Sequence, residues 1–70
     1  MMMVKETRYR EVATQLKKLG WALKSTKGSH EKWVSLSGET LIVPKHTTIS
    51  PGVMRQVIKK LGDKAPKQWK

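Results

Sequence analysis

The chain has 70 residues, which suits one small domain with a limited core, and it contains no cysteine, which excludes disulfides and cysteine-ligated zinc. Fifteen Lys and Arg against five Asp and Glu give a formal net charge of +10, which predicts a polyanionic partner. The basic residues spread over the whole chain instead of one amphipathic helix, so nucleic acid is favoured over a membrane surface. Charge that merely keeps the chain soluble is the alternative.

The N-terminus carries four apolar residues, Met1 to Val4, followed by the charged pair Lys5 and Glu6. Four apolar residues are too few for the hydrophobic region of a signal peptide or for a membrane span. The absence of cysteine also fits a reducing compartment. We therefore expect a cytoplasmic protein with no membrane association.

Apolar residues recur at helical spacing from Thr7 to Leu19 and predict an amphipathic helix. Thr7 is suited to cap its N-terminus, and Gly20 is suited to end it. Trp21 follows this glycine and should pack back on Leu16 in a Schellman-type ending. This makes Trp21 a predicted core residue.

Three short segments with strand character follow, at about 21–26, 30–36 and 40–43. Glycine, serine and charged residues between them provide turns, so we predict an antiparallel meander.

The alternation in the middle segment is imperfect. An ideal strand places Lys32, Val34 and Leu36 on one face and Trp33 on the other. A bulge or a half-exposed Trp33 would reconcile this pattern with a buried face, and the sequence leaves both open.

The last element begins at Ser50 and Pro51, an N-cap followed by proline at the first helical position. Apolar residues then repeat at helical spacing up to Leu61, and Gly62 is suited to end the helix. Residues 63–70 have no apolar periodicity and are expected to form a loose tail.

The order helix, three strands, helix predicts an α+β fold, an α-β-β-β-α two-layer domain. Its two helices should lie on one face of a three-stranded antiparallel sheet. This order resembles the double-stranded-RNA-binding fold, an analogy that concerns architecture and not function. We expect one domain over residues 1–70, with its core at about 7–62.

Few side chains are available for chemistry. The five acidic residues are scattered and predict no two-metal site, and the two histidines do not have zinc-site spacing. We therefore expect no metal and no cofactor. Among the usual acid–base groups near neutral pH, His30 and His46 remain.

His30 begins a predicted strand directly after a tight basic turn, Lys27-Gly28-Ser29. Gly28 lets a backbone approach closely, while Lys27 and Ser29 offer a cation and a hydroxyl to a phosphate. A histidine there could act as general base on an RNA 2′-hydroxyl, or as the acid that protonates the 5′-oxygen. A solvated surface histidine is the alternative interpretation.

Three further residues keep open roles. His46 follows Pro44 and could be a second acid–base group, a phosphate contact, or a structural hydrogen-bonding group in its loop. Trp33 could be buried or could stack on RNA bases. Trp69 is expected to be a tail residue with no fixed role, or an ordered contact in a complex.

Several segments together resemble the HicA family, the messenger-RNA-cleaving toxins of HicA–HicB toxin–antitoxin systems. The resemblance runs from about Tyr9 to Gly62, and its segments are Leu19-Gly20-Trp21, Lys27-Gly28-Ser29-His30, Val43-Pro44-Lys45-His46 and Ser50-Pro51-Gly52-Val53 to Leu61-Gly62. It implies the α-β-β-β-α fold, metal-independent RNA cleavage, catalysis at His30 and a HicB-type partner that covers the RNA-facing surface. The chain departs from the family at Lys32, where HicA-like chains often carry an apolar residue.

The leading hypothesis is therefore an endoribonuclease toxin with His30 as its catalytic residue. Its partners would be messenger RNA and a HicB-like antitoxin, and the free toxin is expected to be monomeric. A non-catalytic RNA-binding module of the same fold is the main alternative, and a degenerate toxin that only binds its antitoxin is another. The residues expected to contact RNA are Lys24, Lys27, Ser29, Lys32 and His46.

Overall fold

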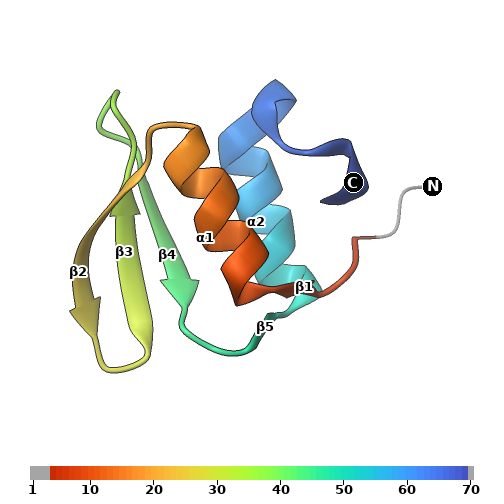
Figure 1. The fold of residues 1–70 in the computed structure, drawn as a ribbon, viewed down its shortest axis with the longest axis horizontal. Helices are drawn as coiled ribbons and strands as arrows, with labels where there is room; N and C mark the ends of the chain where they lie inside the picture. The colour runs from red at the N-terminus through yellow and green to blue at the C-terminus, as the bar shows by residue number, and fades with distance from the viewer. Residues whose placement is uncertain (1–3, 70) are drawn as a thin grey trace.

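The structure is a computed structural model that describes residues 4–69, so the first three residues of the N-terminal apolar run lie outside it. Two helices pack beside a three-stranded sheet, and a short two-stranded pairing joins the segments that precede them (Figure 1). The elements are β1 (Thr7–Arg8), α1 (Tyr9–Lys18), β2 (Ala22–Lys27), β3 (His30–Val34), β4 (Thr40–Pro44), β5 (Thr48–Ile49), α2 (Pro51–Leu61) and the 3-10 turns η1 (Gly62–Lys64) and η2 (Lys67–Trp69).

The main sheet has the strand order β2-β3-β4, and both pairings are antiparallel. Both helices lie on the same side of this sheet, and β2 is the strand farthest from them (Figure 1). The predicted α+β fold with two helices on a three-stranded meander is thus confirmed. The β1–β5 pairing was not predicted, because two-residue strands leave no alternation to recognise.

The start of α1 differs from the prediction. Its N-cap is Arg8, which makes no side-chain capping hydrogen bond, and Thr7 pairs instead with Ile49 in the β1–β5 ladder. A tertiary contact replaces the predicted cap, because the backbone N–H of Tyr9 donates to the carbonyl of Thr47 at 3.0 Å. One of the free N–H groups of the first turn is thereby satisfied from a distant segment.

The end of α1 is the predicted Schellman motif. The N–H of Trp21 donates to the carbonyl of Leu16 at 2.9 Å, and that of Gly20 to Lys17 at 3.1 Å. Gly20 has a φ of 91°, a conformation that side-chain-bearing residues rarely adopt. The motif turns the chain so that Trp21 enters the core, as predicted.

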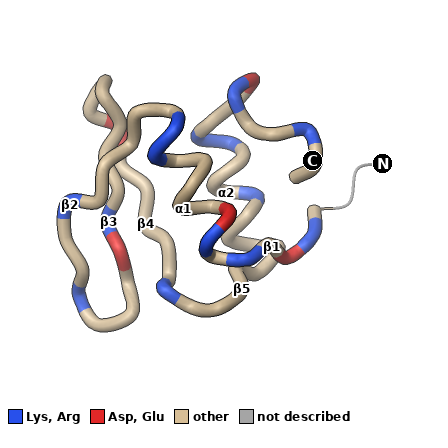
Figure 2. Tube along the Cα trace, in the orientation of Figure 1, with Lys and Arg blue, Asp and Glu red and all other residues tan. Residues whose placement is uncertain are grey.

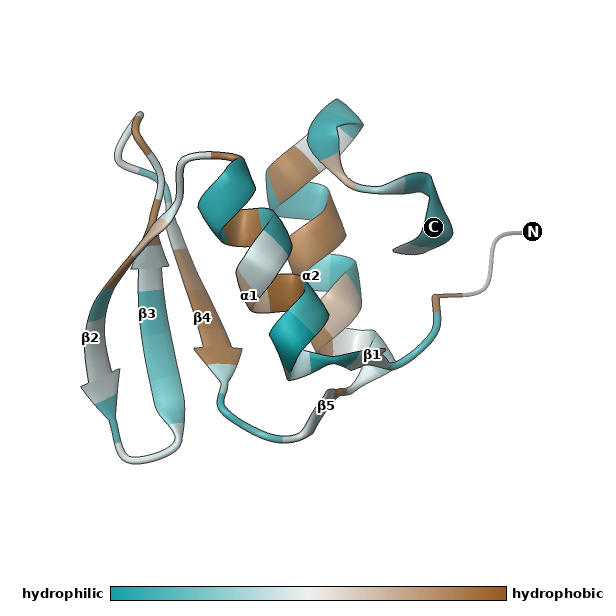
Figure 3. Ribbon diagram, viewed as in Figure 1, coloured by the Kyte–Doolittle hydropathy of each residue, from teal (hydrophilic) through white to brown (hydrophobic). Residues whose placement is uncertain are grey.

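The start of α2 also follows the prediction. Ser50 is the N-cap, its hydroxyl accepts from the N–H of Val53 at 3.4 Å, and Pro51 begins the helix. The apolar face of the helix turns inward, with Met54, Val57 and Leu61 buried. Figure 3 shows hydrophobic positions recurring along both helices and a hydrophobic β4.

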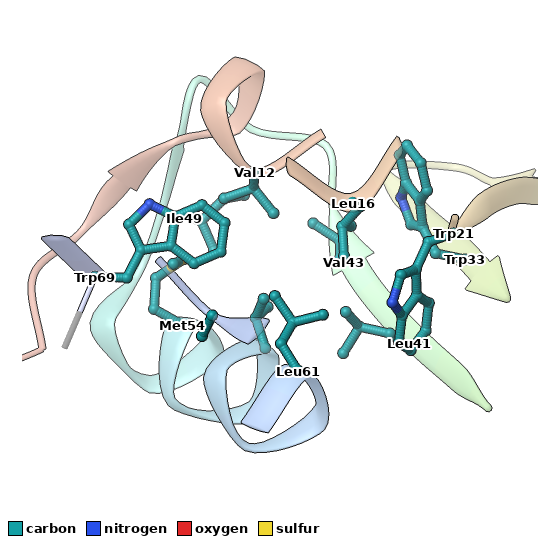
Figure 4. Packing of buried hydrophobic residues seen from close by; sticks show 12 residues of the cluster. Val12, Leu16, Trp21, Trp33, Leu41, Val43, Ile49, Met54, Leu61 and Trp69 are labelled. Atoms are coloured by element: carbon teal, nitrogen blue, oxygen red, sulfur yellow. The ribbon is translucent and has the colours of Figure 1, made fainter. Parts of the chain in front are cut away.

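The core lies between the helices and the inner faces of β3 and β4 (Figure 4). Trp33 is 1% exposed, so it faces the helices and does not stack on an external ligand. The irregularity that the sequence left open lies in β2, where the register shifts between Leu23 and Ser25. Leu36 lies beyond the end of β3 and is 90% exposed, which removes the conflict in the strand pattern.

The segment after Gly62 is not a loose tail over the residues that the structure describes. Two 3-10 turns bring Ala65 and Trp69 back to the core, and Trp69 is 3% exposed. It belongs to the same apolar cluster as Ile49 and Met54 (Figure 4). A single indole buries a large apolar area, so one tryptophan can hold a segment that lacks any periodic pattern.

No helix within residues 4–69 combines the length and the apolar character that crossing a membrane requires.

Candidate functional site

The turn between β2 and β3 is a two-residue hairpin turn. Lys27 pairs with His30, which leaves Gly28 and Ser29 as the turn residues. Gly28 has a φ of 62°, and no non-glycine residue of the described chain has a positive φ. The signs of φ at Gly28 and Ser29 are therefore those of a type II′ turn. A Cβ on Gly28 would meet nothing within 4 Å, so backbone conformation, not space, favours glycine there. The turn thus places His30 as the first paired residue of β3.

The alternation of β3 directs His30 away from the helices. Glu31 and Trp33 are buried on the inner face, while His30 and Lys32 are exposed on the outer one. Lys27 is directly opposite His30, and such pairs have Cβ atoms about 4.5–5.5 Å apart. The open face of the sheet therefore brings Lys27, His30 and Lys32 together.

Lys24 is placed differently. It is exposed on β2 but falls in the register shift between Leu23 and Ser25. The regular alternation that aligns Lys27 with His30 is interrupted at this residue. Of the four predicted basic and hydroxyl contacts near His30, Lys24 is therefore the one that the strand register does not align with it.

The connection between β4 and β5 lies at the same end of the sheet as the β2–β3 turn (Figure 1). His30 pairs with Pro44, and the N–H of Lys45 donates to the carbonyl of Ser29. The N–H of His46 returns to the carbonyl of Pro44 at 3.0 Å and closes a tight turn. These bonds place exposed His46 two residues along the chain from the cross-strand partner of His30.

A hollow opens on the helix side of this connection, beside the start of α1. Two segments far apart in sequence form it, held together by the bond from the Tyr9 N–H to Thr47 and by the β1–β5 ladder. Figure 2 shows basic segments at this end of the molecule, in β2, after β4 and around β1. The hollow is lined by Arg8, Tyr9, Arg10, Lys45, His46 and Thr47.

Tyr9 joins this hollow to the strand that carries His30. Its hydroxyl donates a hydrogen bond to Oε1 of Glu31, a carboxylate that is only 2% exposed. Burial, the hydrogen bond to Glu31 and the negative charge of Glu31 together raise the pKa of Tyr9 to about 12. Tyr9 therefore stays protonated at neutral pH and supplies a donor to a buried acceptor next to His30 in the chain.

Residues 9–62 match the sequence profile of a family described as the HicA toxin of bacterial toxin–antitoxin systems. The chain belongs to the HicA toxin family. It is accordingly a toxin of a toxin–antitoxin system, and it has an antitoxin as partner. Comparisons with curated proteins and with solved structures gave no match. The matched range includes both histidines and ends at Gly62, directly after α2.

Within residues 4–69 of this HicA-family toxin, no three His, Asp or Glu side chains lie close enough together to hold a metal ion. Glu31, one of the scattered acidic residues of the sequence, accepts a hydrogen bond from the hydroxyl of Tyr9.

The toxin has a charged end, formed by the β2–β3 turn, the β4–β5 connection and the start of α1. The sequence prediction missed part of this end. It treated Arg8, Tyr9 and Arg10 as parts of a helix and did not connect them with Lys45 or Glu31. No local pattern could have done so, because the segments are more than twenty residues apart and meet through the Tyr9–Thr47 bond and the Tyr9–Glu31 contact. Among the predicted contacts, Lys27, Ser29 and Lys32 lie around His30, and His46 lies at the same sheet end.

Proposed function

We propose that this toxin is a metal-independent endoribonuclease that cleaves messenger RNA with His30 as its catalytic residue. The observation that supports it best is an exposed imidazole on the open face of the sheet, with Lys27 opposite it and Lys32 on the same strand face. A phosphodiester on this face would meet a proton-transfer group and two cations at once. The family match spans these residues.

The proposed reaction is the transesterification that RNA undergoes through its own 2′-hydroxyl. The 2′-oxygen attacks the adjacent phosphorus, the bond from phosphorus to the 5′-oxygen breaks, and a 2′,3′-cyclic phosphate and a 5′-hydroxyl result. One proton leaves the 2′-hydroxyl and one is added to the 5′-oxygen, and His30 carries one of these two transfers. Cations beside the phosphate stabilise the charge that develops on its oxygens.

RNA would be held mainly through its backbone. The contacts proposed are Lys24, Lys27, Ser29, Lys32 and His46, all of which are exposed. Phosphate contacts give affinity without sequence preference and make that affinity salt-dependent.

The antitoxin is proposed to be of the HicB type and to cover His30 and the neighbouring lysines. A toxin with a formal charge of +10 favours an acidic surface on this partner. We propose that the free toxin is a monomer and acts in the cytoplasm, where messenger RNA is found.

His30→Ala tests the catalytic assignment. In EDTA, under single-turnover conditions, the variant should cleave RNA about 10²- to 10⁴-fold more slowly than wild type. Its thermal unfolding should be unchanged, because the side chain is exposed and makes no hydrogen bond that holds the fold. His46→Ala removes the other exposed imidazole, a proposed RNA contact, and should weaken RNA binding while leaving the cleavage rate at saturating protein near that of wild type.

Three outcomes would contradict the proposal. Cleavage by His30→Ala at the wild-type rate would remove the catalytic role and favour the non-catalytic RNA-binding module. Loss of wild-type cleavage in EDTA with recovery in magnesium would contradict metal independence. A large loss in His46→Ala alone would move the catalytic role to that histidine.

A further inference from the structure

The hollow beside the start of α1 lies next to the proposed cleavage site. Its wall includes Lys45, and the backbone N–H of Lys45 donates to the carbonyl of Ser29, the residue before His30. Lys45 is therefore the residue of the hollow that lies against the turn before His30, and an RNA strand that continued past His30 around this sheet end would reach it. From Lys45 the hollow continues toward the exposed Arg8 and Arg10.

The charges around this hollow favour an anion. Arg8, Arg10 and Lys45 contribute cations, His46 contributes an imidazole, and no acidic residue is among the described residues that line it. Glu31 lies nearby behind the wall, but it is buried and accepts the Tyr9 hydroxyl.

A second hollow on the other side of the same arginines is less suited to an anion. Arg8 and Arg10 border it too, but its wall also includes Glu11, together with Gln68 and Trp69 from the C-terminal segment. The carboxylate of Glu11 would repel a phosphate there. The arginines and Lys45 face a common ligand only on the side of Tyr9.

An aromatic wall distinguishes this hollow from a bare phosphate site. Tyr9 is half-buried and lines the hollow, while its hydroxyl is held by Glu31. A ring that is fixed in this way loses little freedom when a base stacks on it, and stacking on aromatic rings accepts any base. The cations of this hollow suit the phosphate of a nucleotide, and the ring of Tyr9 suits its base.

We propose that this hollow binds one nucleotide of the RNA outside the cleaved bond, with its phosphate at Arg8, Arg10 and Lys45 and its base on Tyr9. This rests on the proposed function in that the strand concerned is the RNA held at His30. The hollow thus extends the binding surface by a nucleotide beyond the residues that contact the scissile phosphate. RNAs too short to reach it should be cleaved with a higher KM and nearly unchanged kcat.

The test uses the full chain and a fluorescent 12-nucleotide single-stranded RNA with 2′-O-methyl groups, which cannot be cleaved. Arg10→Gln/Lys45→Gln should weaken its binding and lower the salt slope, log Kd against log salt, by about 0.7 for each phosphate that the variant no longer neutralises. Lys59→Gln/Lys60→Gln, at the exposed end of α2, removes the same charge elsewhere and should leave this slope nearly unchanged.

The aromatic wall is tested with two substitutions at one position. Tyr9→Leu should weaken binding about 5- to 150-fold, the range for removal of one base–aromatic stack. Tyr9→Phe keeps the ring but loses the hydroxyl bond to Glu31 that holds it, so it should weaken binding far less than Tyr9→Leu. If Tyr9→Leu fails to fold, the charge variants still decide the proposal.

The result that overturns the proposal is equal weakening by the hollow pair and the α2 pair, which would mean that net charge alone matters. Unchanged RNA binding by the hollow pair with weakened antitoxin binding would also overturn it and make the hollow an antitoxin contact. The proposed function can fail independently of this inference. If wild type binds RNA through the hollow but does not cleave it, the proposed nuclease activity is refuted and the nucleotide site remains. If His30→Ala abolishes cleavage but the hollow pair binds RNA as wild type does, the nuclease activity is supported and the nucleotide site is refuted.

Discussion

The helices and the inner faces of β3 and β4 form one region of this protein, and the β2–β3 turn with the β4–β5 connection forms another. In the first region Val12, Leu16 and Val43 have no exposed surface, and apolar side chains face one another (Figure 4). In the second, every residue of β2 and the turn is exposed. Stability therefore depends on the first region, and the residues proposed to act on RNA lie in the second, where they can be changed without unfolding the chain.

Tyr9 connects the two regions, because its backbone N–H donates to Thr47 in the β4–β5 connection and its side chain reaches the strand that carries His30. Tyr9, at the start of α1, reaches Glu31 on β3, which directly follows His30. Glu31 is buried and Tyr9 is half-buried, so the pair belongs to the core by burial and, because Glu31 follows His30, to the charged end by position. Substitutions here should affect stability and function together, which separates the pair from either region.

The largest change in stability is expected for Trp69→Ala. Removing a buried tryptophan costs about 3–5 kcal/mol of unfolding free energy, a large part of what a domain of this size has. Urea unfolding measures the loss. Leu36→Ala, at a 90% exposed position, is the matched truncation and should change stability by less than about 0.5 kcal/mol. Equal effects of the two variants would show that the C-terminal segment is not part of the packed region.

A smaller loss is expected for Tyr9→Phe, which removes the hydroxyl that Glu31 accepts and leaves a buried carboxylate without that donor. Such a loss costs about 1–3 kcal/mol. The double variant Tyr9→Phe/Glu31→Leu removes both polar groups and should recover part of it. If Tyr9→Phe is as stable as wild type, the hydrogen bond does not connect the two regions.

The same pair predicts a pH dependence. Folding raises the pKa of Tyr9 from 10.0 to about 12, so its contribution is complete below about pH 10 and is lost as the pH rises toward 12, because the unfolded chain releases this proton first. The stability difference between wild type and Tyr9→Phe should shrink from about pH 10 to about pH 12. Comparison with Tyr9→Phe at each pH cancels the titration of the lysines. A difference that grows over this range would contradict the assignment.

The smallest effects on stability are expected on the open face of the sheet. Lys27→Gln and Lys24→Gln should each change unfolding free energy by no more than about 0.5 kcal/mol, since both side chains are exposed. RNA affinity should fall more in Lys27→Gln, because Lys27 is opposite His30 while Lys24 lies in the register shift. Equal losses of affinity would show that RNA binding does not follow the face of His30.

Local patterns determined much of this molecule. The Ser50-Pro51 start of α2, the glycine ending of α1 and the Lys27-Gly28-Ser29-His30 turn all depend on backbone conformations and hydrogen bonds within a few residues. The sequence accordingly predicts the order of elements, the sheet order and the exposed place of a histidine after a tight turn. Thr7 and residues 63–69 differ from the prediction because pairing with Ile49 and burial of Trp69 outweigh local preference.

The two amphipathic helices, the meander and the turn that holds Lys27, Ser29 and His30 together follow from local residue patterns, because periodicity and turn chemistry act over short stretches of chain. Three features depend on the packing of distant segments: Trp33 faces inward, Glu31 is paired with Tyr9, and Arg8 and Arg10 line the same hollow as Lys45. These outcomes depend on which face of a strand the helices cover and on backbone bonds between segments far apart in sequence. No local pattern of residues predicts either of these, so the residues that make up the charged end cannot be predicted from short stretches of the sequence.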